Sequence, residues 1–128
     1  MFCKSHRGKK ILILETDFLD REALSMVLAT EGYMVPAAKG CDEAMAVLRS
    51  PERPDLILLD LSTGNEEVLT FCRTVRGEPA FATVPIVALT HKDTDRSILE
   101  GAHCLDKPVD TSRLLEAIGA HLLVPSAS

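Results

Sequence analysis

Four polar side chains that can handle phosphate follow apolar runs in this sequence. They are the carboxylates of Glu15 and Asp60, the hydroxyl of Thr90 and the amine of Lys107. A carboxylate can attack a phosphoryl group as a nucleophile and form an acyl phosphate. Carboxylate oxygens also suit Mg²⁺, and an ammonium or a hydroxyl can contact phosphate oxygens. If the fold gathers the four, they predict phosphoryl transfer to an aspartate.

Each of these residues also has a structural interpretation when it is taken alone. Asp60 could accept loop amides, Thr90 could cap the next turn, and Lys107 could be a solvated surface lysine. Asp17 is predicted to cap a helix, with Asp20 placed to favour the positive end of the helix dipole. The functional interpretation depends on the combination, because each residue of the four stands at the end of a predicted strand.

Five short apolar runs alternate with amphipathic stretches along the chain. The runs predict strands at 9–15, 33–37, 55–60, 85–90 and 101–106. The stretches between and after them predict helices at 17–31, 41–50, 65–77, 93–100 and 110–122. This alternation predicts an α/β fold with a parallel sheet and helices on both faces. Ligands bind such sheets at the carboxyl ends of the strands, where the four polar residues are expected.

Composition limits the classes of protein that this chain can be. The 128 residues are 46% hydrophobic, which suits one domain with a core, and the net charge of −5 argues against direct nucleic-acid binding. The one basic cluster, residues 4–10, is expected to be a solvated extension. No signal peptide or membrane-length apolar run is present, so a cytoplasmic location and no membrane partner are expected.

The cysteines and histidines do not predict a zinc site. Cys3, Cys41, Cys72 and Cys104 are far apart and form no C-x-x-C pair, and the four histidines show no metal-binding spacing. Three of the cysteines fall within or beside apolar segments. They are therefore expected to be reduced thiols that pack as small hydrophobic side chains.

The order of these segments resembles the receiver domain of two-component response regulators. The resemblance rests on the run 11–15, the run 55–60, the run 85–90 and the segment 101–108 with its Lys107-Pro108, and it spans about residues 10–122. It implies a flavodoxin-like, doubly wound five-stranded parallel sheet with strand order 2-1-3-4-5. The expected organisation is a basic extension at 1–9, the receiver domain at 10–123 and a tail at 124–128.

The resemblance also assigns roles to individual residues. It implies that Asp60 is the phosphoacceptor, Thr90 the switch hydroxyl and Lys107 the phosphate-binding lysine, with a cis peptide bond before Pro108. Mg²⁺ would be held by Glu15, Asp60 and the backbone carbonyl of Ser62.

The partners that the resemblance implies belong to a signalling domain rather than to an enzyme. A histidine kinase or a phosphotransfer protein would donate the phosphoryl group. An output partner would bind the last strand and last helix, where Leu115 and Leu122 are expected to be exposed, and a homodimer is possible.

Several positions depart from the family pattern. Thr16 replaces the second of two adjacent acids, which predicts weak Mg²⁺ binding unless Asp17 compensates, and capping competes with that. Cys104 replaces the aromatic residue three positions before the lysine. The loop after Asp60 lacks the usual proline and acidic-glycine pair, and the segment 90–107 is short.

Two other classes of function remain open from the sequence. One is a pseudo-receiver, a protein-binding module of the same fold that signals without phosphate. The other is a small α/β enzyme, either a haloacid dehalogenase-type phosphatase or a flavodoxin. The first predicted strand disfavours both enzymes, because it ends on Glu15 instead of a nucleophilic aspartate, and Glu15-Thr16-Asp17 would repel a phosphate.

Overall fold

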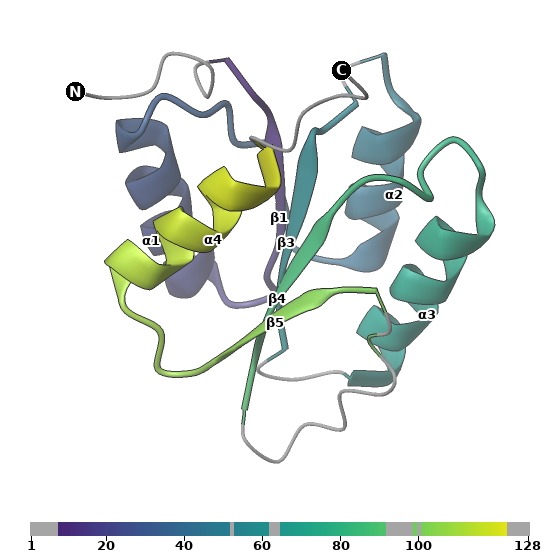
Figure 1. Cartoon of the computed structure of the whole chain (residues 1–128). Coiled ribbons are helices and arrows are strands. Elements are labelled where there is room, and N and C mark those ends of the chain that lie inside the picture. Colours follow the sequence, from purple (N-terminus) through teal and green to yellow (C-terminus); the bar gives the residue numbers. More distant parts are fainter. Residues whose placement is uncertain (1–7, 52, 62–64, 92–98, 100, 123–128) are drawn as a thin grey trace.

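A computed structural model describes residues 8–51, 53–61, 65–91, 99 and 101–122. Its centre is a parallel sheet of five strands in the order β2-β1-β3-β4-β5 (Figure 1). The strands are β1 (Ile11–Leu14), β2 (Ala37–Ala38), β3 (Leu56–Asp60), β4 (Ile86–Thr90) and β5 (His103–Asp106). The fold class and the strand order expected from the sequence are confirmed.

Helices cover both faces of this sheet. Those in the described part of the chain are α1 (Phe18–Thr30), α2 (Cys41–Arg49), α3 (Asn65–Gly77) and α4 (Thr111–Leu122). In Figure 1, α1 and α4 lie on one side of the sheet and α2 and α3 on the other. The short helix predicted at 93–100 lies outside the described residues, apart from the buried Leu99. No helix in the described ranges has the length and apolar character needed to cross a membrane.

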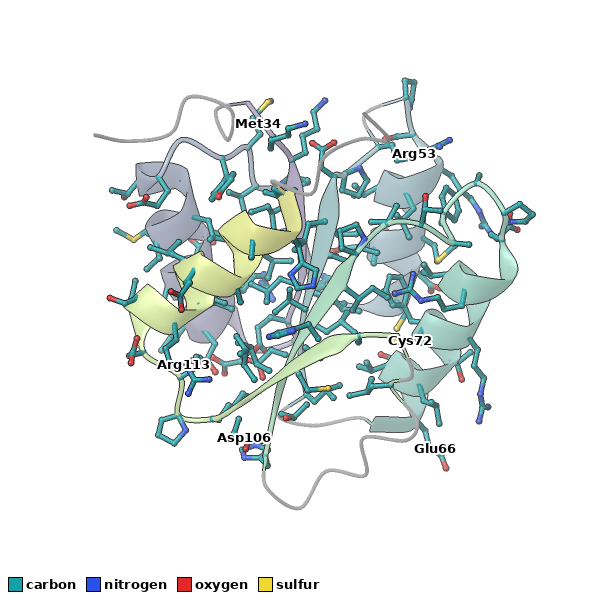
Figure 2. The ribbon with its side chains drawn as sticks, viewed as in Figure 1. Met34, Arg53, Glu66, Cys72, Asp106 and Arg113 are labelled. Atoms are coloured by element: carbon teal, nitrogen blue, oxygen red, sulfur yellow. The ribbon has the colours of Figure 1, made fainter. Side chains whose placement is uncertain are left out.

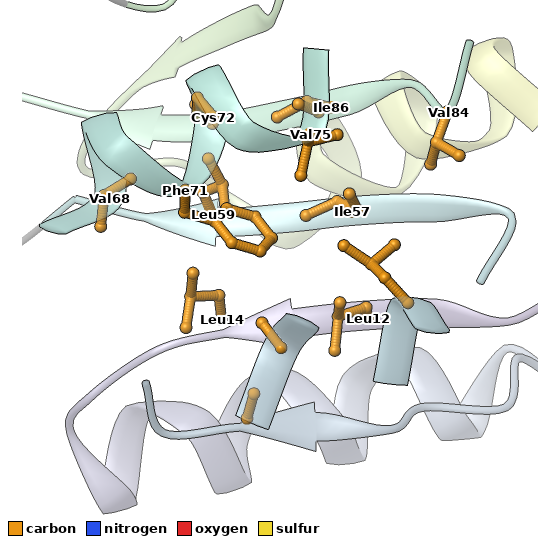
Figure 3. Close-up of a cluster of buried hydrophobic side chains, with 14 of the residues drawn as sticks. Leu12, Leu14, Ile57, Leu59, Val68, Phe71, Cys72, Val75, Val84 and Ile86 are labelled. Atoms are coloured by element: carbon orange, nitrogen blue, oxygen red, sulfur yellow. The ribbon is translucent and has the colours of Figure 1, made fainter. Parts of the chain in front are cut away.

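Alternation along the strands divides the core into two layers. Leu12, Leu14 and Ile57 belong to the layer under α2 and α3, while their neighbours Ile11 and Ile13 belong to the layer under α1 and α4. Figure 3 shows the first of these layers, with Phe71 of α3 beside Leu59 of β3. Because successive side chains of a strand point to opposite faces, continuous apolar strands fill both layers.

The helix ends follow the predicted capping chemistry. The Asp17 carboxylate accepts a hydrogen bond from the Asp20 N–H at 2.9 Å and caps α1. After the helix, Gly32 takes φ = +95°, a conformation that favours glycine. The Asp110 carboxylate accepts from the Arg113 N–H at 2.8 Å and caps the start of α4.

All five strands are shorter than the ranges predicted for them, and backbone features explain two of the cases. β2 covers only Ala37–Ala38, with a single bridge from Met34 to Lys10 before it. Pro36 between these pairs has no N–H to donate, although its carbonyl accepts from Ile13. β5 begins at His103 because Gly101 adopts φ = +88° in a turn that the Ala102 N–H closes on Leu99. Apolar character alone therefore overstated both strands.

The described cysteines are free thiols. Cys72 is buried in the α2/α3 layer, and Cys41 and Cys104 are half-buried against it. Burial raises the pKa of the Cys72 thiol from its ordinary value of 9.0 to about 11. The expectation of reduced, packed thiols is confirmed for these three, and Cys3 lies outside the described residues.

We expect Cys72 of the folded protein to react with iodoacetamide at least about a hundredfold more slowly than in urea. The thiolate is the reactive species, and a pKa of about 11 in place of 9.0 lowers the thiolate fraction about a hundredfold at pH 8, before access is considered. Timed labelling followed by peptide mass spectrometry measures both rates on the same residue. A native rate within tenfold of the rate in urea would contradict the buried position.

Candidate functional site

The register of the strands brings the predicted residues to one edge of the sheet. Leu14 pairs with Leu59, so Glu15 and Asp60 follow at the same level on neighbouring strands. On the next strands Asp60 pairs with Leu89, and Thr90 pairs with Asp106, the residue before Lys107. In Figure 2, Asp106 marks this edge at the lower end of the sheet. It is the carboxyl edge, where ligands bind parallel sheets.

Asp60 and Lys107 form an ion pair at this edge. The Lys107 ammonium donates to Oδ1 of Asp60, and the Asp60 carboxylate is almost entirely buried while the lysine side chain is partly exposed. The peptide bond between Lys107 and Pro108 is cis, as the family resemblance implied. The site thus holds a nearly buried nucleophile-type oxygen next to a positive charge that can contact an anion.

Glu15 lies beside this pair and is 1% exposed. Its Oε2 accepts the Asp17 N–H at 2.8 Å, whereas the buried Oε1 accepts no hydrogen bond from any described residue. The pKa of Glu15 is raised from 4.5 to about 7, mainly by burial and then by the Asp60 carboxyl, and the Asp17 N–H opposes the rise. Asp60 contributes because a second negative charge close to the Glu15 carboxylate is unfavourable.

A third carboxylate completes the cluster, and it comes from Asp20. Glu15, Asp20 and Asp60 each place one oxygen so that all three lie within 4.8 Å of one another. The sequence suggested Asp17 as the acid that could compensate for Thr16, but the Asp17 side chain is occupied in capping α1. That suggestion was wrong. The sequence predicted for Asp20 only an interaction with the helix dipole, and its position in the first turn of α1 was the missed signal.

Two of the three clustered carboxylates, those of Asp20 and Asp60, border a pocket of about 530 Å³. Its lining is drawn from α1, β3, β4 and the segment after β5, and comprises Asp20, Ala23, Leu24, Asp60, Leu89, His91, Lys107, Pro108 and Val109. A larger cavity of about 660 Å³ lies between α2 and α3, but it holds none of the three clustered carboxylates. We therefore assign the function to the pocket beside Asp60.

Thr90 is not among the residues that line this pocket. Alternation along β4 places Leu89 in the α1/α4 layer and Thr90 on the opposite side of the strand. The buried Thr90 hydroxyl instead donates to the Leu105 carbonyl and to Oδ1 of Asp106, at 3.4 Å each. The structure thus brings Asp60 and Lys107 together, while the hydroxyl is engaged with β5. Ser62, the predicted backbone ligand, lies outside the described residues.

The exposed apolar side chains lie on a different helix from the one expected. Leu115 and Leu122 are half-buried and pack against the α1/α4 core, so they supply less exposed surface than expected. On α1, by contrast, Phe18, Leu19 and Met26 are 60%, 74% and 69% exposed.

Comparisons with known proteins decide the family. The sequence model of the response regulator receiver domain matches residues 11–119. The chain belongs to the receiver domain family of two-component response regulators. The receiver is 33% identical to the alkaline phosphatase synthesis transcriptional regulatory protein SphR of Synechococcus elongatus and 32% identical to the transcriptional regulatory protein GltR of Pseudomonas aeruginosa. These alignments cover 84% and 92% of the receiver, but the chain spans only about half of each relative, 46% and 50%.

Solved receiver structures have the same fold. The receiver domain of the sensor histidine kinase PA1611 from Pseudomonas aeruginosa, which carries a magnesium ion coordinated in its active site cleft, aligns with a TM-score of 0.78 at 25% identity, over 90% of this chain and 98% of that one. The chemotaxis response regulator CheY4 of Vibrio cholerae aligns with a TM-score of 0.77 at 26% identity, over 89% and 98%. With the family shown, nothing supports the two enzyme alternatives.

Proposed function

We propose that this receiver signals by accepting a phosphoryl group on Asp60. A carboxylate oxygen of Asp60 attacks the phosphorus of the donor, and a P–O bond forms as the bond from phosphorus to the donor's leaving group breaks. The product is an aspartyl phosphate, and attack by water on its phosphorus returns the carboxylate and inorganic phosphate. The observation that carries the proposal is the nearly buried Asp60 carboxylate, paired with Lys107 at the mouth of an open pocket.

Lys107 and Thr90 have different parts in this proposal. The Lys107 ammonium, now paired with Asp60, would contact an oxygen of the incoming phosphoryl group and offset its charge. The Thr90 hydroxyl would have to leave its acceptors on β5 to reach the phosphoryl group. Phosphorylation would then be sensed as a change in the contacts of Leu105 and Asp106. Because Cys104 replaces the aromatic side chain, the readout would not involve the ring movement usual in the family.

The residues at the site fit a magnesium ion. All three clustered donors are carboxylate oxygens, which Mg²⁺ prefers, and the buried Oε1 of Glu15 still lacks a partner among the described residues. Glu15 and Asp60 would hold the ion, with the Ser62 carbonyl as a further expected ligand. When bound, Mg²⁺ neutralises phosphate charge and orients the donor. The magnesium ion in the PA1611 receiver supports this assignment.

The donor would be a histidine kinase or a phosphotransfer protein. Any donor that reaches Asp60 must approach the pocket wall formed by α1, and it would cover the exposed Phe18 and Leu19 at the start of that helix. An output partner would bind β5 and α4, the elements next to the acceptors of the Thr90 hydroxyl. We place these events in the cytoplasm, in a domain covering residues 10–123, with no catalytic turnover beyond phosphorylation and dephosphorylation of Asp60 itself.

We expect the protein to gain the mass of one phosphoryl group, about 80 Da, on incubation with acetyl phosphate and Mg²⁺. Asp60→Asn removes the nucleophile but keeps nearly the same shape, so this variant should gain nothing. Intact mass spectrometry at 1, 10 and 50 mM Mg²⁺ tests both proteins. If the wild-type protein forms no adduct at any Mg²⁺ concentration, the receiver signals without phosphate and belongs to the pseudo-receiver class.

A further inference from the structure

The acidic pocket of this receiver is built from residues that are not adjacent in the sequence. The family pattern places two acids side by side after the first strand, and Thr16 stands here at the second of those positions. Thr16 is exposed and cannot supply a carboxylate. Asp20 comes four residues later, in the first turn of α1, and both borders the pocket and shares the carboxylate cluster with Glu15 and Asp60.

A network of hydrogen bonds fixes Asp20 next to the other acids. Its own N–H donates to the Asp17 carboxylate, and the Asp17 N–H donates to Glu15. The Arg21 guanidinium donates to the carbonyls of Glu15 at 2.8 Å and Thr16 at 3.3 Å, which joins the loop to the helix. The end of β1 and the start of α1 therefore form one bonded unit that positions the backbone of Asp20, while its exposed carboxylate reaches the two buried acids.

A second observation points to a missing ligand at this place. The Glu15 side chain is almost completely buried, with 1% of its surface exposed. Its Oε1 has no hydrogen-bond partner among the described residues. Burying an unpaired carboxylate oxygen is unfavourable, and a cation bound to the cluster would satisfy it. The unpaired Oε1 of Glu15 and the nearby carboxylate of Asp20 are separate observations, and a single bound cation would satisfy both.

We propose that Asp20 is the third carboxylate ligand of the Mg²⁺ site and replaces the acid that Thr16 does not supply. The proposal rests on the phosphorylation function proposed above. It replaces the weak Mg²⁺ binding expected from Thr16 with tighter binding, because a pocket with three acids binds Mg²⁺ more tightly than a pocket with two. Asp20 could act directly on the ion or through an ordered water, and either form makes Mg²⁺ affinity depend on this carboxylate.

The alternative role of Asp20 is purely structural. An acid in the first turn stabilises a helix through its dipole whether or not a metal is present. The two roles predict different effects when the Asp20 carboxylate is removed. Loss of a dipole interaction changes the stability of the metal-free protein, whereas loss of a ligand changes the affinity for Mg²⁺. Both quantities can be measured on the same variant.

The test is a calorimetric titration of metal-free protein with MgCl₂. We expect Asp20→Asn to weaken Mg²⁺ binding at least tenfold, while Glu22→Gln, the same loss of charge on an exposed neighbour in α1, changes it less than twofold. Adding Thr16→Asp to Asp20→Asn restores the net charge and the family arrangement, and should return the affinity to within about threefold of wild type. Melting of the metal-free proteins, followed by circular dichroism, verifies that the variants are folded.

Two outcomes distinguish this proposal from the proposed function. If Asp20→Asn weakens binding no more than Glu22→Gln, while Glu15→Gln and Asp60→Asn weaken it strongly, Asp20 is not a ligand and the phosphorylation site stands. If none of these substitutions changes the affinity, the pocket does not bind Mg²⁺, and both proposals are overturned.

Discussion

Lys107→Met is expected to tighten Mg²⁺ binding about tenfold and, at the same time, to slow phosphorylation of Asp60 at least tenfold. In the metal-free protein the Lys107 ammonium is paired with Oδ1 of Asp60, one of the oxygens available to a metal. A cation that enters the pocket must compete with that ammonium for the same carboxylate. Removing the ammonium therefore favours the metal.

Coulomb's law gives the scale of this effect. Two like charges about 4 Å apart near a protein surface repel by at most about 4 kcal/mol, and hydration and salt reduce that value. A residual of about 1.4 kcal/mol already corresponds to a tenfold change in affinity. Phosphorylation should move in the opposite direction, because an incoming phosphoryl group loses the positive charge that would contact its oxygens.

Lys107→Met should raise Mg²⁺ affinity and lower the rate of phosphorylation, and general damage to the pocket would not produce these opposite changes. A variant that merely loosened the pocket would lose both Mg²⁺ affinity and phosphorylation. Calorimetric titration with MgCl₂ and the rate of mass gain from acetyl phosphate measure the two quantities separately. Lys39→Met is the matched control, since Lys39 is exposed and does not line this pocket. Equal or weaker Mg²⁺ binding by Lys107→Met would show that the lysine does not compete with the metal.

The sequence predicted the fold well because the signals involved are regional. Strands β1, β3 and β4 are short apolar runs buried on both faces, and alternating them with amphipathic helices leaves few possible topologies. Once the strands are parallel and in register, Glu15, Asp60 and Lys107 must reach the same edge. Their convergence could therefore be predicted without any knowledge of side-chain conformation.

The direction of single side chains was beyond the sequence. Asp17 and Asp20 are both acids near the start of α1, and only the position of the cap decides which one is free to join the pocket. The Thr90 hydroxyl lies at the predicted strand end, yet its acceptors are on β5. These outcomes depend on a difference of one residue in a cap or in strand alternation, which reverses the face that a side chain occupies.

Without divalent cations, Glu15→Gln is expected to stabilise the protein by about 1–2 kcal/mol at pH 8 and to have little effect at pH 5. The pKa of Glu15 is about 7 in the folded protein against an ordinary 4.5, so the folded state holds a proton that the unfolded state has lost between these values. The stability from this group is complete below pH 4.5 and is lost as the pH rises through 7. Each pKa unit corresponds to about 1.4 kcal/mol, and solvent at the pocket mouth reduces the total.

Urea unfolding in EDTA gives the free energy of unfolding of wild type and Glu15→Gln at pH 5 and pH 8. The effect is the change in the gap between the two proteins from one pH to the other. Every other titratable group is present in both proteins and cancels in the comparison. The glutamine amide also has an acceptor at hand, since the Asp60 carboxylate lies beside position 15. If wild type and variant lose the same stability between the two pH values, Glu15 is ionised throughout, and the burial argument fails.

Mg²⁺ should reverse the stability ranking of wild type and Glu15→Gln at pH 8, because it stabilises only a pocket that retains its carboxylates. The Glu15 charge thus destabilises the metal-free domain, and a cation bound at the carboxylate cluster would offset that cost.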